Sequence, residues 1–560
     1  MKNHLRIEGR PVLPALFGAA VAAAALVAGA AGVQPPRADA ARAHKAHFER
    51  PRLTHGELIV RGTNGSDSIA LRLEAGDPNV IQVDLNDDGS PEFSFGRARV
   101  RRIVVDARSG DDHVRIDDSN GAFTDGIPTA IFGGDGNDKI SGGAGAELLI
   151  GGDGNDAIDG SGGADTALLG SGDDTFSWDP GDGSDRIEGQ DGTDTMLFDG
   201  GAGPDTVDVS ANGSRLRFFR NPGNITMDTR GVERVNFKAL GGADTVTVND
   251  LSGTDVQNVN LDLAGTFAAA SGTDRVTVNG TNRNESINVS GDASGVAVTG
   301  LRAQVAIQHQ DPTDQLTVNG LGGNDTISAT GLAAGAIIES LDGGDGNDSI
   351  AGGAGNEALL GESGSDTIDG NGGADTALLG AGGDTFVWDP GDGSDAIEGG
   401  DGTDTMVFNG GAGADTVDAS ANGNHLRFFR NPGNVTMDTH GVERVLFNAL
   451  GGADAVTVHD LSGTGVSSVD LDLAGSLGGS AGDGSADHVT VDGTNGNDSI
   501  GVVSEGCGVK VSGLAATVEL LHAEAADRLD VETLAGLDTV DSAGLAAGSD
   551  RKSTRLNSSH

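Results

Sequence analysis

The sequence predicts an all-β protein, and three observations support this prediction. Glycine contributes 94 of the 560 residues, about 17% against a usual ~7%. Two segments repeat an acidic and an apolar residue every nine positions, and other segments alternate polar and apolar residues in short runs, as half-buried strands do. Aromatic residues make up only 3%, so few large side chains are available to fill a compact enzyme core.

Charge and cysteine content exclude further classes of protein. The 84 Asp and Glu residues outnumber the 35 Lys and Arg residues, which gives a formal net charge of −49. So negative a surface repels a phosphate polymer, and we expect no nucleic-acid partner. Cys507 is the single cysteine, so the chain cannot form an internal disulfide. Disorder, neutralisation by cations and a regular repeat remain open, and the sequence favours the last two together.

The N-terminal segment 1–40 is predicted to be an export signal. It begins with basic residues, continues as an Ala/Val/Leu run over 12–33 and ends on an A-x-A cleavage signature at 38–40. A retained membrane anchor is the alternative, because the apolar run approaches the ~20 residues that span a bilayer. Its Ala- and Gly-dominated composition is weakly hydrophobic and favours cleavage. We therefore expect a secreted, extracellular protein with no membrane span in the mature chain.

The rest of the chain is a duplication. Gly133–Asp138 recurs 210 residues later at Gly343–Asp348, and Trp178 recurs at Trp388 with the same offset. The tail has no counterpart in the repeats and resembles translated adapter sequence, so we expect it to be foreign and the native chain to be longer. The predicted organisation is a signal peptide (1–40), a β-rich spacer (41–132), a nonapeptide block (133–197), a spacer (198–342), a second block (343–407), a third spacer (408–549) and the tail (550–560).

Both blocks keep a nine-residue register. Complete repeats have glycine at positions one, two and four, and position eight is apolar. Position six is acidic in every repeat, at Asp138, Glu147, Asp156, Asp165, Asp174, Asp185 and Asp194 in the first block and at Asp348, Glu357, Asp366, Asp375, Asp384, Asp395 and Asp404 in the second. A disordered acidic linker would not hold an apolar residue two positions after each acid, so both blocks are predicted to fold.

The chemistry of one nonapeptide indicates a cation site. Its glycines permit positive φ, so six residues can form a tight turn with carbonyl oxygens pointing inward, and the next three residues suit a short strand. Carboxylate and carbonyl oxygens are the ligands that a hard cation such as Ca²⁺ prefers. Zinc or copper would favour His or Cys, which the two blocks lack. The sequence therefore predicts several Ca²⁺ ions as cofactors.

The pattern G-G-x-G-x-D-x-U-x resembles the RTX, or haemolysin-type, calcium-binding nonapeptide of bacterial extracellular proteins. Gly133–Ser141 and Gly151–Asp159 match it at every defined position. The resemblance implies a parallel β-roll in which two nonapeptides complete one coil and Ca²⁺ lies between the turns of repeats n and n+2. The predicted fold is thus β-roll or β-solenoid blocks that alternate with β-rich spacers.

The same resemblance implies which residues bind the ions. Asp156 would share one ion with Asp138 and a second with Asp174. Asp165 would face Asp185 on the opposite side of the roll. Seven repeats would hold about five ions per block under this scheme. The full set of implied metal ligands, through a carboxylate or a main-chain carbonyl, is Gly133, Asp135, Asp138, Asp153, Asp156, Asp165, Asp174, Asp185, Asp194, Gly343, Asp345, Asp348, Asp366, Asp375, Asp384, Asp395 and Asp404.

Some repeats depart from the pattern. Glu147 and Glu357 are one methylene longer than Asp, and a two-residue insertion at Trp178 and at Trp388 shifts the register. We expect weaker sites there. Without a cation the stacked carboxylates should repel one another, so binding is expected to drive folding of the blocks.

These features predict a non-enzymatic, secreted calcium-binding protein. A calcium-stiffened adhesin or matrix protein, with cell-surface components as partners, is the alternative. A fragment of a secreted RTX hydrolase is a third hypothesis, but nearly every segment belongs to a repeat. Gly478–Gly482 satisfies the G-x-S-x-G nucleophile pattern, yet it lies in a Gly/Ser insertion without a strand-then-helix context, so we interpret it as coincidence. The spacers are predicted to be β-rich and chemically quiet.

Overall fold

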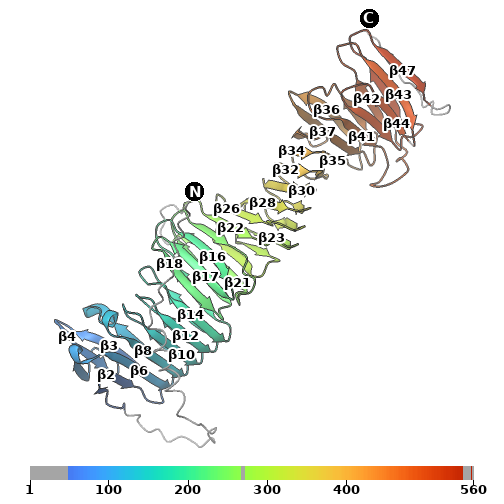
Figure 1. Ribbon diagram of the computed structural model, residues 1–560. Helices are drawn as coiled ribbons and strands as arrows, with labels where there is room; N and C mark the ends of the chain where they lie inside the picture. Colours follow the sequence, from blue (N-terminus) through green and yellow to red (C-terminus); the bar gives the residue numbers. More distant parts are fainter. Residues whose placement is uncertain (1–47, 266–271, 507, 546–555, 558–560) are drawn as a thin grey trace, which may run out of the picture. The chain divides into compact units, whose positions relative to one another are not determined.

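The computed structural model describes residues 48–265, 272–506, 508–545 and 556–557. The chain forms two compact units, Met1–Asp174 and Thr175–His560, and strands dominate both (Figure 1). The described helices are short 3₁₀ turns at Arg97–Arg99 (η2), Asp118–Asn120 (η3) and Thr124–Gly126 (η4). Within the described ranges, none is long and apolar enough to cross a membrane. The predicted all-β fold class is confirmed.

Strands of the first unit form two sheets. The first sheet contains β1 (Arg52–Thr54), β2 (Glu57–Arg61), β6 (Arg102–Ser109), β8 (Thr129–Asp135), β10 (Leu148–Asp153) and β12 (Thr166–Ser171). The second contains β3 (Ser68–Glu74), β4 (Asp77–Asp84), β5 (Phe93–Gly96), β7 (His113–Asp117), β9 (Lys139–Ser141) and β11 (Ala157–Asp159). From β6 and β7 onward, β6–β8–β10–β12 and β7–β9–β11 pair in parallel, whereas β1–β2 and β3–β4–β5 are antiparallel.

An 18-residue coil is the repeating unit of the nonapeptide segment. Leu149 is in register with Ile131 on one side and with Ala167 on the other, and Ile158 is in register with Ile140. Successive strands alternate between the two sheets, so each coil adds one strand to each sheet. Two nonapeptides therefore complete one coil, as expected for a parallel β-roll.

The second unit continues the same plan. Its first sheet contains β14 (Arg186–Asp191), β16 (Thr206–Asn212), β17 (Arg215–Asn221), β18 (Ile225–Arg230), β20 (Thr245–Val248), β22 (Arg275–Asn279), β26 (Gln315–Asn319), β28 (Ile338–Asp345), β30 (Ala358–Gly364), β32 (Thr376–Gly382), β34 (Ala396–Gly402), β36 (Thr416–Asn422), β37 (His425–Asn431), β38 (Val435–His440), β40 (Ala455–Val458), β42 (His488–Asp492), β46 (Arg528–Glu532) and β48 (Leu556–Asn557). Its second sheet contains β13 (Thr175–Trp178), β15 (Thr195–Asp199), β19 (Arg234–Leu240), β21 (Asn258–Gly265), β23 (Ser286–Asp292), β24 (Gly295–Thr299), β25 (Gln304–Gln308), β27 (Thr326–Leu332), β29 (Ser349–Ala351), β31 (Thr367–Asp369), β33 (Thr385–Trp388), β35 (Thr405–Asn409), β39 (Arg444–Asn448), β41 (Ser468–Asp472), β43 (Ser499–Glu505), β44 (Gly508–Ser512), β45 (Thr517–Leu521) and β47 (Thr539–Gly544).

Antiparallel meanders interrupt the parallel stacking in the second unit. In the first sheet β16, β17 and β18 form one, and β18 then pairs in parallel with β14 while β16 pairs in parallel with β20. A three-stranded antiparallel meander also forms at β36–β38 in the first sheet, and at β23–β25 and β43–β45 in the second sheet. The spacers thus extend the two sheets of the roll and add hairpin strands to them.

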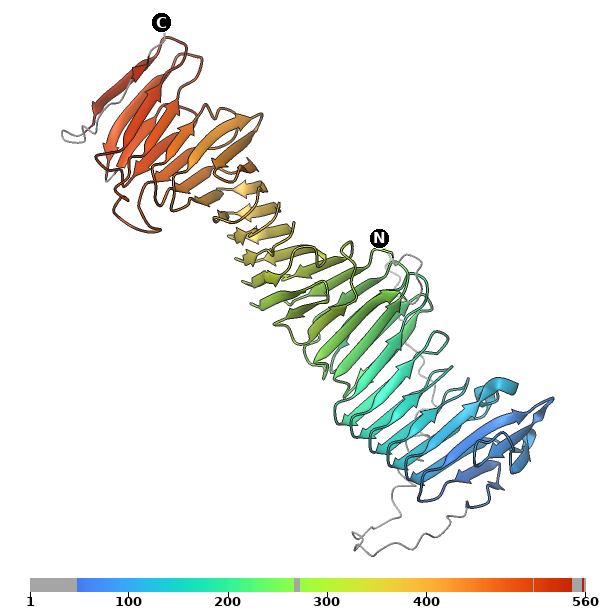
Figure 2. The same ribbon diagram turned by 180° about the vertical axis from the view of Figure 1, so that it is seen from behind.

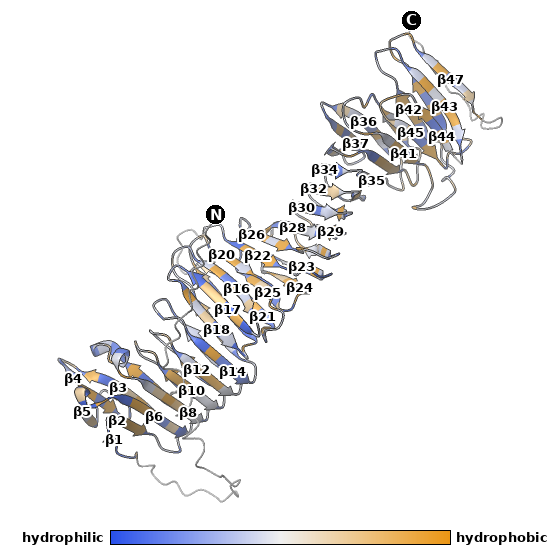
Figure 3. Ribbon diagram, in the orientation of Figure 1, coloured by the Kyte–Doolittle hydropathy of each residue, from blue (hydrophilic) through white to orange (hydrophobic). Residues whose placement is uncertain are grey.

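Alternation of side chains builds the core between the sheets. Hydrophobic and hydrophilic residues alternate along the strands of each unit (Figure 3), and Figure 2 shows the same strands from behind. Every eighth-position residue of the blocks is buried. These core residues are Ile140, Leu149, Ile158, Ala167, Phe176, Ile187 and Met196 in the first block and Ile350, Leu359, Ile368, Ala377, Phe386, Ile397 and Met406 in the second.

The two tryptophans are packing residues. Trp178 stacks on Phe198 with ring centroids 4.0 Å apart, and Trp388 stacks on Phe408 at the same distance. Trp178 Nε1 donates a hydrogen bond to the carbonyl of Gly183 at 2.8 Å, which satisfies its only polar group. Each two-residue insertion therefore anchors an aromatic cluster.

Some predictions concern residues outside the described part of the chain. The export signal at 1–40 and Cys507 lie there entirely. Of the tail at 550–560, only the backbone of Leu556–Asn557 is described, as β48 beside β46.

Candidate metal sites in columns of stacked carboxylates

Glycine lets the turns of successive coils stack closely. Gly152 and Gly154 have φ of 127° and 128°, a region that side chains disfavour. A Cβ atom at Gly152 would lie 2.0 Å from the carbonyl oxygen of Gly134, and one at Gly154 would lie 2.1 Å from that of Gly136. At these two positions the turn rests on the carbonyl groups of the turn 18 residues earlier, and only glycine fits there.

In the first unit this stacking places the sixth-position acids in a column. The amide of Asp138 donates to Asp156 Oδ1 at 2.8 Å, and the amide of Asp156 donates to Asp174 Oδ1 at 2.7 Å. On the other side of the roll the amide of Glu147 donates to Asp165 Oδ1 at 2.7 Å. All five acids are buried. The structure thus brings together the n and n+2 acids of these repeats.

The second block lies wholly within one unit and contains two complete columns. In one column, each backbone amide donates a hydrogen bond to Oδ1 of the aspartate in the next coil, at 2.8–2.9 Å. The donors are Asp348, Asp366 and Asp384, and the column ends at Asp404. On the opposite side the amide of Glu357 donates to Asp375 Oδ1 at 2.8 Å, and the amide of Asp375 donates to Asp395 Oδ1 at 2.9 Å. All five predicted n and n+2 pairs of this block are adjacent. The insertion at Trp388 lengthens the spacing from 18 to 20 residues without breaking the column.

The second carboxylate oxygen of these acids is left without a donor. Asp366 Oδ2 is buried and accepts no hydrogen bond from any residue that the structure describes. A Cβ atom at Gly361 would lie 2.7 Å from this oxygen and 2.3 Å from the carbonyl oxygen of Leu379, so both oxygens converge beside Gly361. The same unpaired Oδ2 occurs, within the described ranges, at Asp138, Asp156, Asp348 and Asp395. Burying such an oxygen without a donor or a cation is costly.

Burial raises the pKa of these carboxyl groups. The pKa of Asp366 rises to about 7, because the group is buried and lies near the charges of Asp384 and Asp348. The pKa of Asp375 rises to about 8, again through burial and then through Glu357 and Asp395. Burial likewise raises the pKa of Asp156 to about 7. In the absence of a cation, these three acids therefore keep a proton to a higher pH than a free carboxyl group does.

The chemistry of the donors fits a hard cation. The described residues contain no group of three or more His, Cys, Asp and Glu side chains able to hold a metal ion. An ion in a column would thus be held by main-chain carbonyls and by single carboxylates from adjacent coils, an all-oxygen set that Ca²⁺ accepts. Gly133 fits this arrangement, because a Cβ there would lie 2.2 Å from Asp138 Oδ2 and 2.6 Å from the carbonyl oxygen of Gly151. At Gly343, the corresponding distance to Asp348 Oδ2 is 2.5 Å.

The third-position aspartates differ from the column acids. The side chains of Asp135, Asp153 and Asp345 are exposed. Their carbonyl oxygens accept hydrogen bonds from Gly110, Gly136 and Gly323, respectively, at 2.7–2.8 Å. One such bond leaves a second lone pair on each oxygen, so ligation through these carbonyls stays a prediction.

The remaining predicted ligands lie where the two units divide. Asp165 and Asp174 belong to the first unit, Asp185 and Asp194 belong to the second, and all four are buried. The predicted pairing of Asp165 with Asp185 therefore stays a prediction. Within the second unit, the amide of Asp194 donates to Glu233 Oε2 at 2.8 Å.

Acid columns also run through the spacers, contrary to the prediction that these segments are chemically quiet. The amides of Asp205, Asp244 and Asp274 each donate to Oδ1 of the next buried aspartate, at 2.7–2.9 Å, and this column ends at Asp314. Burial raises the pKa of Asp244 to about 7. The signal was the acid two positions before a buried strand residue, as in Asp244-Thr245-Val246.

A second ladder runs along the fifth position of the repeats. Asn137 Oδ1 accepts from the amide of Asn155 at 2.7 Å, and Asn155 Oδ1 accepts from the amide of Asp173 at 2.9 Å. These bonds stabilise the stacking of the turns at the surface. The fifth position is variable in the nonapeptide pattern, so no role for it could be predicted from the sequence.

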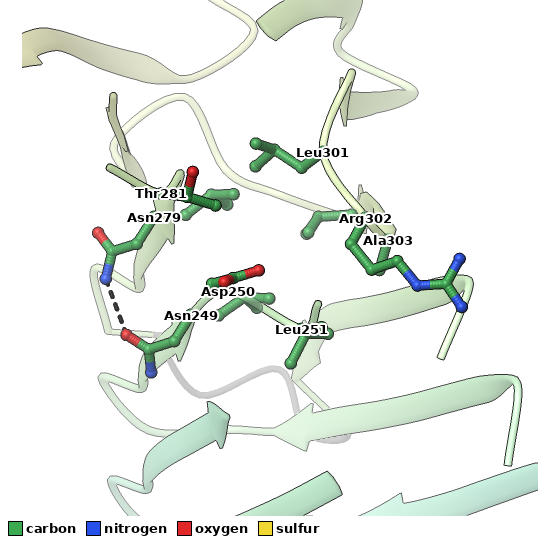
Figure 4. Close-up of a pocket in the computed structure, with 11 residues that line it drawn as sticks. Asn249, Asp250, Leu251, Asn279, Thr281, Leu301, Arg302 and Ala303 are labelled. Carbon is green, nitrogen blue, oxygen red and sulfur yellow. Dashed lines mark hydrogen bonds between the residues drawn. The ribbon is translucent and has the colours of Figure 1, made fainter. Parts of the chain in front are cut away.

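Two hollows lie in the second unit. A cavity in the second unit measures about 20 Å³, and Asn279 donates to Asn249 across its wall at 2.9 Å (Figure 4). Such a volume holds about one water molecule. An open hollow of about 640 Å³ is lined by 480–482 and 522–526. It contains the exposed Ser480 of the G-x-S-x-G pattern, which lies in the loop between β41 and β42 rather than between a strand and a helix.

Stacked coils, two parallel sheets and buried acid columns define a calcium-type parallel β-roll. A family model for the RTX calcium-binding nonapeptide repeat matches the chain over 130–158, 141–176, 181–207, 334–367, 352–386 and 391–426. The chain therefore carries RTX calcium-binding nonapeptide repeats in both predicted blocks, and the matches extend beyond them.

Comparison with solved structures finds the extracellular lipase LipA from Serratia marcescens, at 14% sequence identity and a TM-score of 0.18. The match covers 76% of this chain and 43% of the lipase, so the chain spans less than half the length of that protein. This TM-score is too low to indicate a shared fold or a shared activity. A comparison with characterised proteins found no match.

Proposed function

We propose that this chain is a secreted calcium-binding protein in which Ca²⁺ between stacked turns drives folding of the β-roll. The observation that carries the proposal is the pair of continuous acid columns in the second block. There, buried carboxylates lie one coil apart, and the Oδ2 atoms of Asp348, Asp366 and Asp395 find no protein donor within the described chain. Ca²⁺ supplies the missing positive charge and accepts oxygen ligands.

The columns also support coupling between binding and folding. Neutralising buried, mutually repelling carboxylates favours the folded state, because the unfolded chain holds no such columns. The high negative charge of the chain adds repulsion that divalent cations reduce. Export into a calcium-rich exterior follows from the predicted signal at 1–40.

Calcium titration of the full chain tests this function. We expect Ca²⁺ at millimolar concentration to raise β content in circular dichroism and to compact the chain in small-angle scattering, and EDTA to reverse both changes. Mg²⁺ at the same concentration is the control, because it demands a tighter octahedral set of ligands and retains its water. No spectral or scattering response to Ca²⁺ would exclude the proposal.

A calcium-stiffened adhesin or matrix protein remains the alternative role for the same sites. It requires a partner in addition to the ion. Binding of the calcium-loaded chain to cells or to extracellular polysaccharide, lost with EDTA, would favour this role over a protein that only binds calcium.

A further inference from the structure

A buried arginine faces a buried aspartate at two positions of the second unit. Arg220 Nη2 lies 2.7 Å from Asp205 Oδ1, and Arg430 Nη2 lies 2.7 Å from Asp415 Oδ1. Both arginine side chains are 9% exposed and both aspartate side chains are 0% exposed. By contrast, no Lys, Arg or His of the described chain forms an ion pair with the column acids of the second block.

Both arginines face complete nonapeptides. Gly200–Asp208 and Gly410–Asp418 carry glycine at positions one, two and four, aspartate at six and valine at eight. The family matches at 181–207 and 391–426 reach into these segments. The sequence pattern alone would therefore assign them calcium, like the repeats of the blocks.

The turn at Asp205 shares with the block turns the approach of two oxygens to its first glycine. A Cβ at Gly200 would lie 2.7 Å from Asp205 Oδ2 and 2.8 Å from the carbonyl oxygen of Lys238, much as one at Gly361 would approach Asp366. The amide of Asp205 donates to the next acid of its column, Asp244, at 2.7 Å. Unlike Asp366 Oδ2, however, Asp205 Oδ2 accepts a hydrogen bond from the amide of Gly201 at 2.8 Å, and Asp415 Oδ2 accepts one from the amide of Gly411 at 2.8 Å. These two turns therefore differ from the Asp366 turn in this amide donor as well as in the nearby counter-charge.

The guanidinium lies directly on this turn. A Cβ at Gly201 would be 2.9 Å from Arg220 Nη2, and one at Gly411 would be 3.0 Å from Arg430 Nη2. Arg220 extends from β17, the middle strand of a meander, and its guanidinium lies 5.3 Å from the centroid of Trp178. Arg430 extends from β37 in the same way, 5.4 Å from Trp388. The same arrangement thus occurs in both copies.

We propose that Arg220 and Arg430 are built-in cations that take the place of Ca²⁺ at Asp205 and Asp415, so that these two complete nonapeptides bind no calcium. A guanidinium keeps its charge at all physiological pH values and pairs with a buried carboxylate without a metal. It would also repel a divalent ion from the same turn. This inference rests on the proposed calcium binding of the other repeats.

Removing the arginines should create calcium sites. In the double variant Arg220→Met with Arg430→Met, the carboxylates lose their counter-charge while the long apolar stem is retained. We expect equilibrium dialysis to show two more bound Ca²⁺ ions per chain than in the unaltered protein, and circular dichroism to show a folded chain at saturating Ca²⁺. An unchanged ion count would overturn the inference, and so would a failure to fold at saturating Ca²⁺.

Two matched variants separate charge replacement from general damage. Arg217 and Arg427 lie on the same strands but pair at the surface with Asp208 and Asp418, so their double replacement by Met should leave the ion count unchanged. Replacing Arg220 and Arg430 by Lys keeps the positive charge and should also leave it unchanged; a gain of ions there would contradict the inference. If the unaltered chain binds calcium and the Met variant gains none, only this inference fails. If the unaltered chain binds none, the proposed function fails first.

Discussion

The two oxygens of a column aspartate perform different tasks. Asp366 Oδ1 accepts the amide of Asp348 and so holds two coils in register, whereas Asp366 Oδ2 lies beside Gly361 without a donor from the described chain. The first oxygen stabilises the fold both with and without Ca²⁺. The second destabilises the folded state unless a proton or a cation is present.

Asp366→Asn should therefore change stability in opposite directions with and without calcium. The amide still offers an acceptor to Asp348 but carries no charge, so in EDTA at pH 8 we expect the urea midpoint of the variant to rise. In saturating Ca²⁺ we expect a loss of about 2 kcal/mol, because a charged ligand shared by two neighbouring sites is removed. The exposed Asp401→Asn is the control and should shift neither midpoint. Equal effects in both solvents would refute the cation role of Asp366.

Asp156→Ala tests sharing of one carboxylate in the first block. The carboxylate of Asp156 accepts from the amide of Asp138, and the amide of Asp156 donates to the carboxylate of Asp174. Loss of the Asp156 carboxylate should therefore weaken two calcium sites at once. Calorimetric titration measures this as a lower ion count or affinity. Unchanged stoichiometry and affinity would show that the ligand geometry is wrong.

Gly361→Ala should destabilise the roll through steric conflict. The new Cβ would lie 2.3 Å from the carbonyl oxygen of Leu379, which belongs to backbone and cannot move aside cheaply. We expect a loss of about 2 kcal/mol in urea unfolding with Ca²⁺ present. Gly413→Ala is the matched control, because its Cβ would meet no atom within 4 Å, and it should change stability by less than about 0.5 kcal/mol. Equal losses would argue against close stacking of the turns.

Sequence reasoning located single residues well inside the blocks and poorly outside them. The column acids and the eighth-position core residues follow from the nine-residue period, because the period itself is the repeat of the coil. The ion pair between Arg220 and Asp205 could not be predicted, since the two residues meet only after β17 folds back in a meander. The fifth-position ladder was missed because it depends on stacking, and stacking does not restrict that position to one residue type.

Strands of the meanders bury one face in the aromatic clusters. On β37, Phe428 is buried, and its ring centroid lies 4.8 Å from that of Phe408. The neighbouring Phe429 lies on the other face of the strand, where the guanidinium of Arg427 covers its ring. Phe428→Ala should cost about 3–5 kcal/mol in urea unfolding with Ca²⁺ present, the usual range for a buried phenylalanine. Phe429→Ala should cost less than about 1 kcal/mol. Similar costs for the two variants would contradict the assignment of faces on β37.

The parallel coils were predictable as elements, but the meanders were not. A nonapeptide encodes its turn and its strand within nine residues, so local sequence determines the coil. In the spacers, alternation predicts strands such as β20 and β21, yet it does not state which strand lies beside which. The return of β18 to β14 depends on pairing across about 40 residues, which periodicity cannot show.

Proton binding sets how the chain as a whole responds to pH. The pKa values of Asp366, Asp375 and Asp395 are raised to about 7, 8 and 6, chiefly by burial, so the folded state holds protons that the unfolded chain releases near pH 4. This protonation stabilises the fold most at low pH, and the contribution is lost as pH rises through 6–8. In EDTA we expect the urea midpoint to be higher at pH 5.5 than at pH 8.5. In saturating Ca²⁺ the difference should shrink or reverse, because the cation replaces the protons. A midpoint in EDTA that rises with pH would contradict this sign.

Amide hydrogen exchange with and without Ca²⁺ examines the acid columns most directly. Column amides, such as those of Asp366 and Asp384, donate to the carboxylate of the next coil. We predict that Ca²⁺ slows exchange most strongly in peptides from 133–197 and 343–407, and much less in peptides from β17 and β37, where an arginine already supplies the charge. Exchange that is unchanged by Ca²⁺ in both blocks, or slowed equally along the whole chain, would contradict the role of stacked carboxylates as calcium sites.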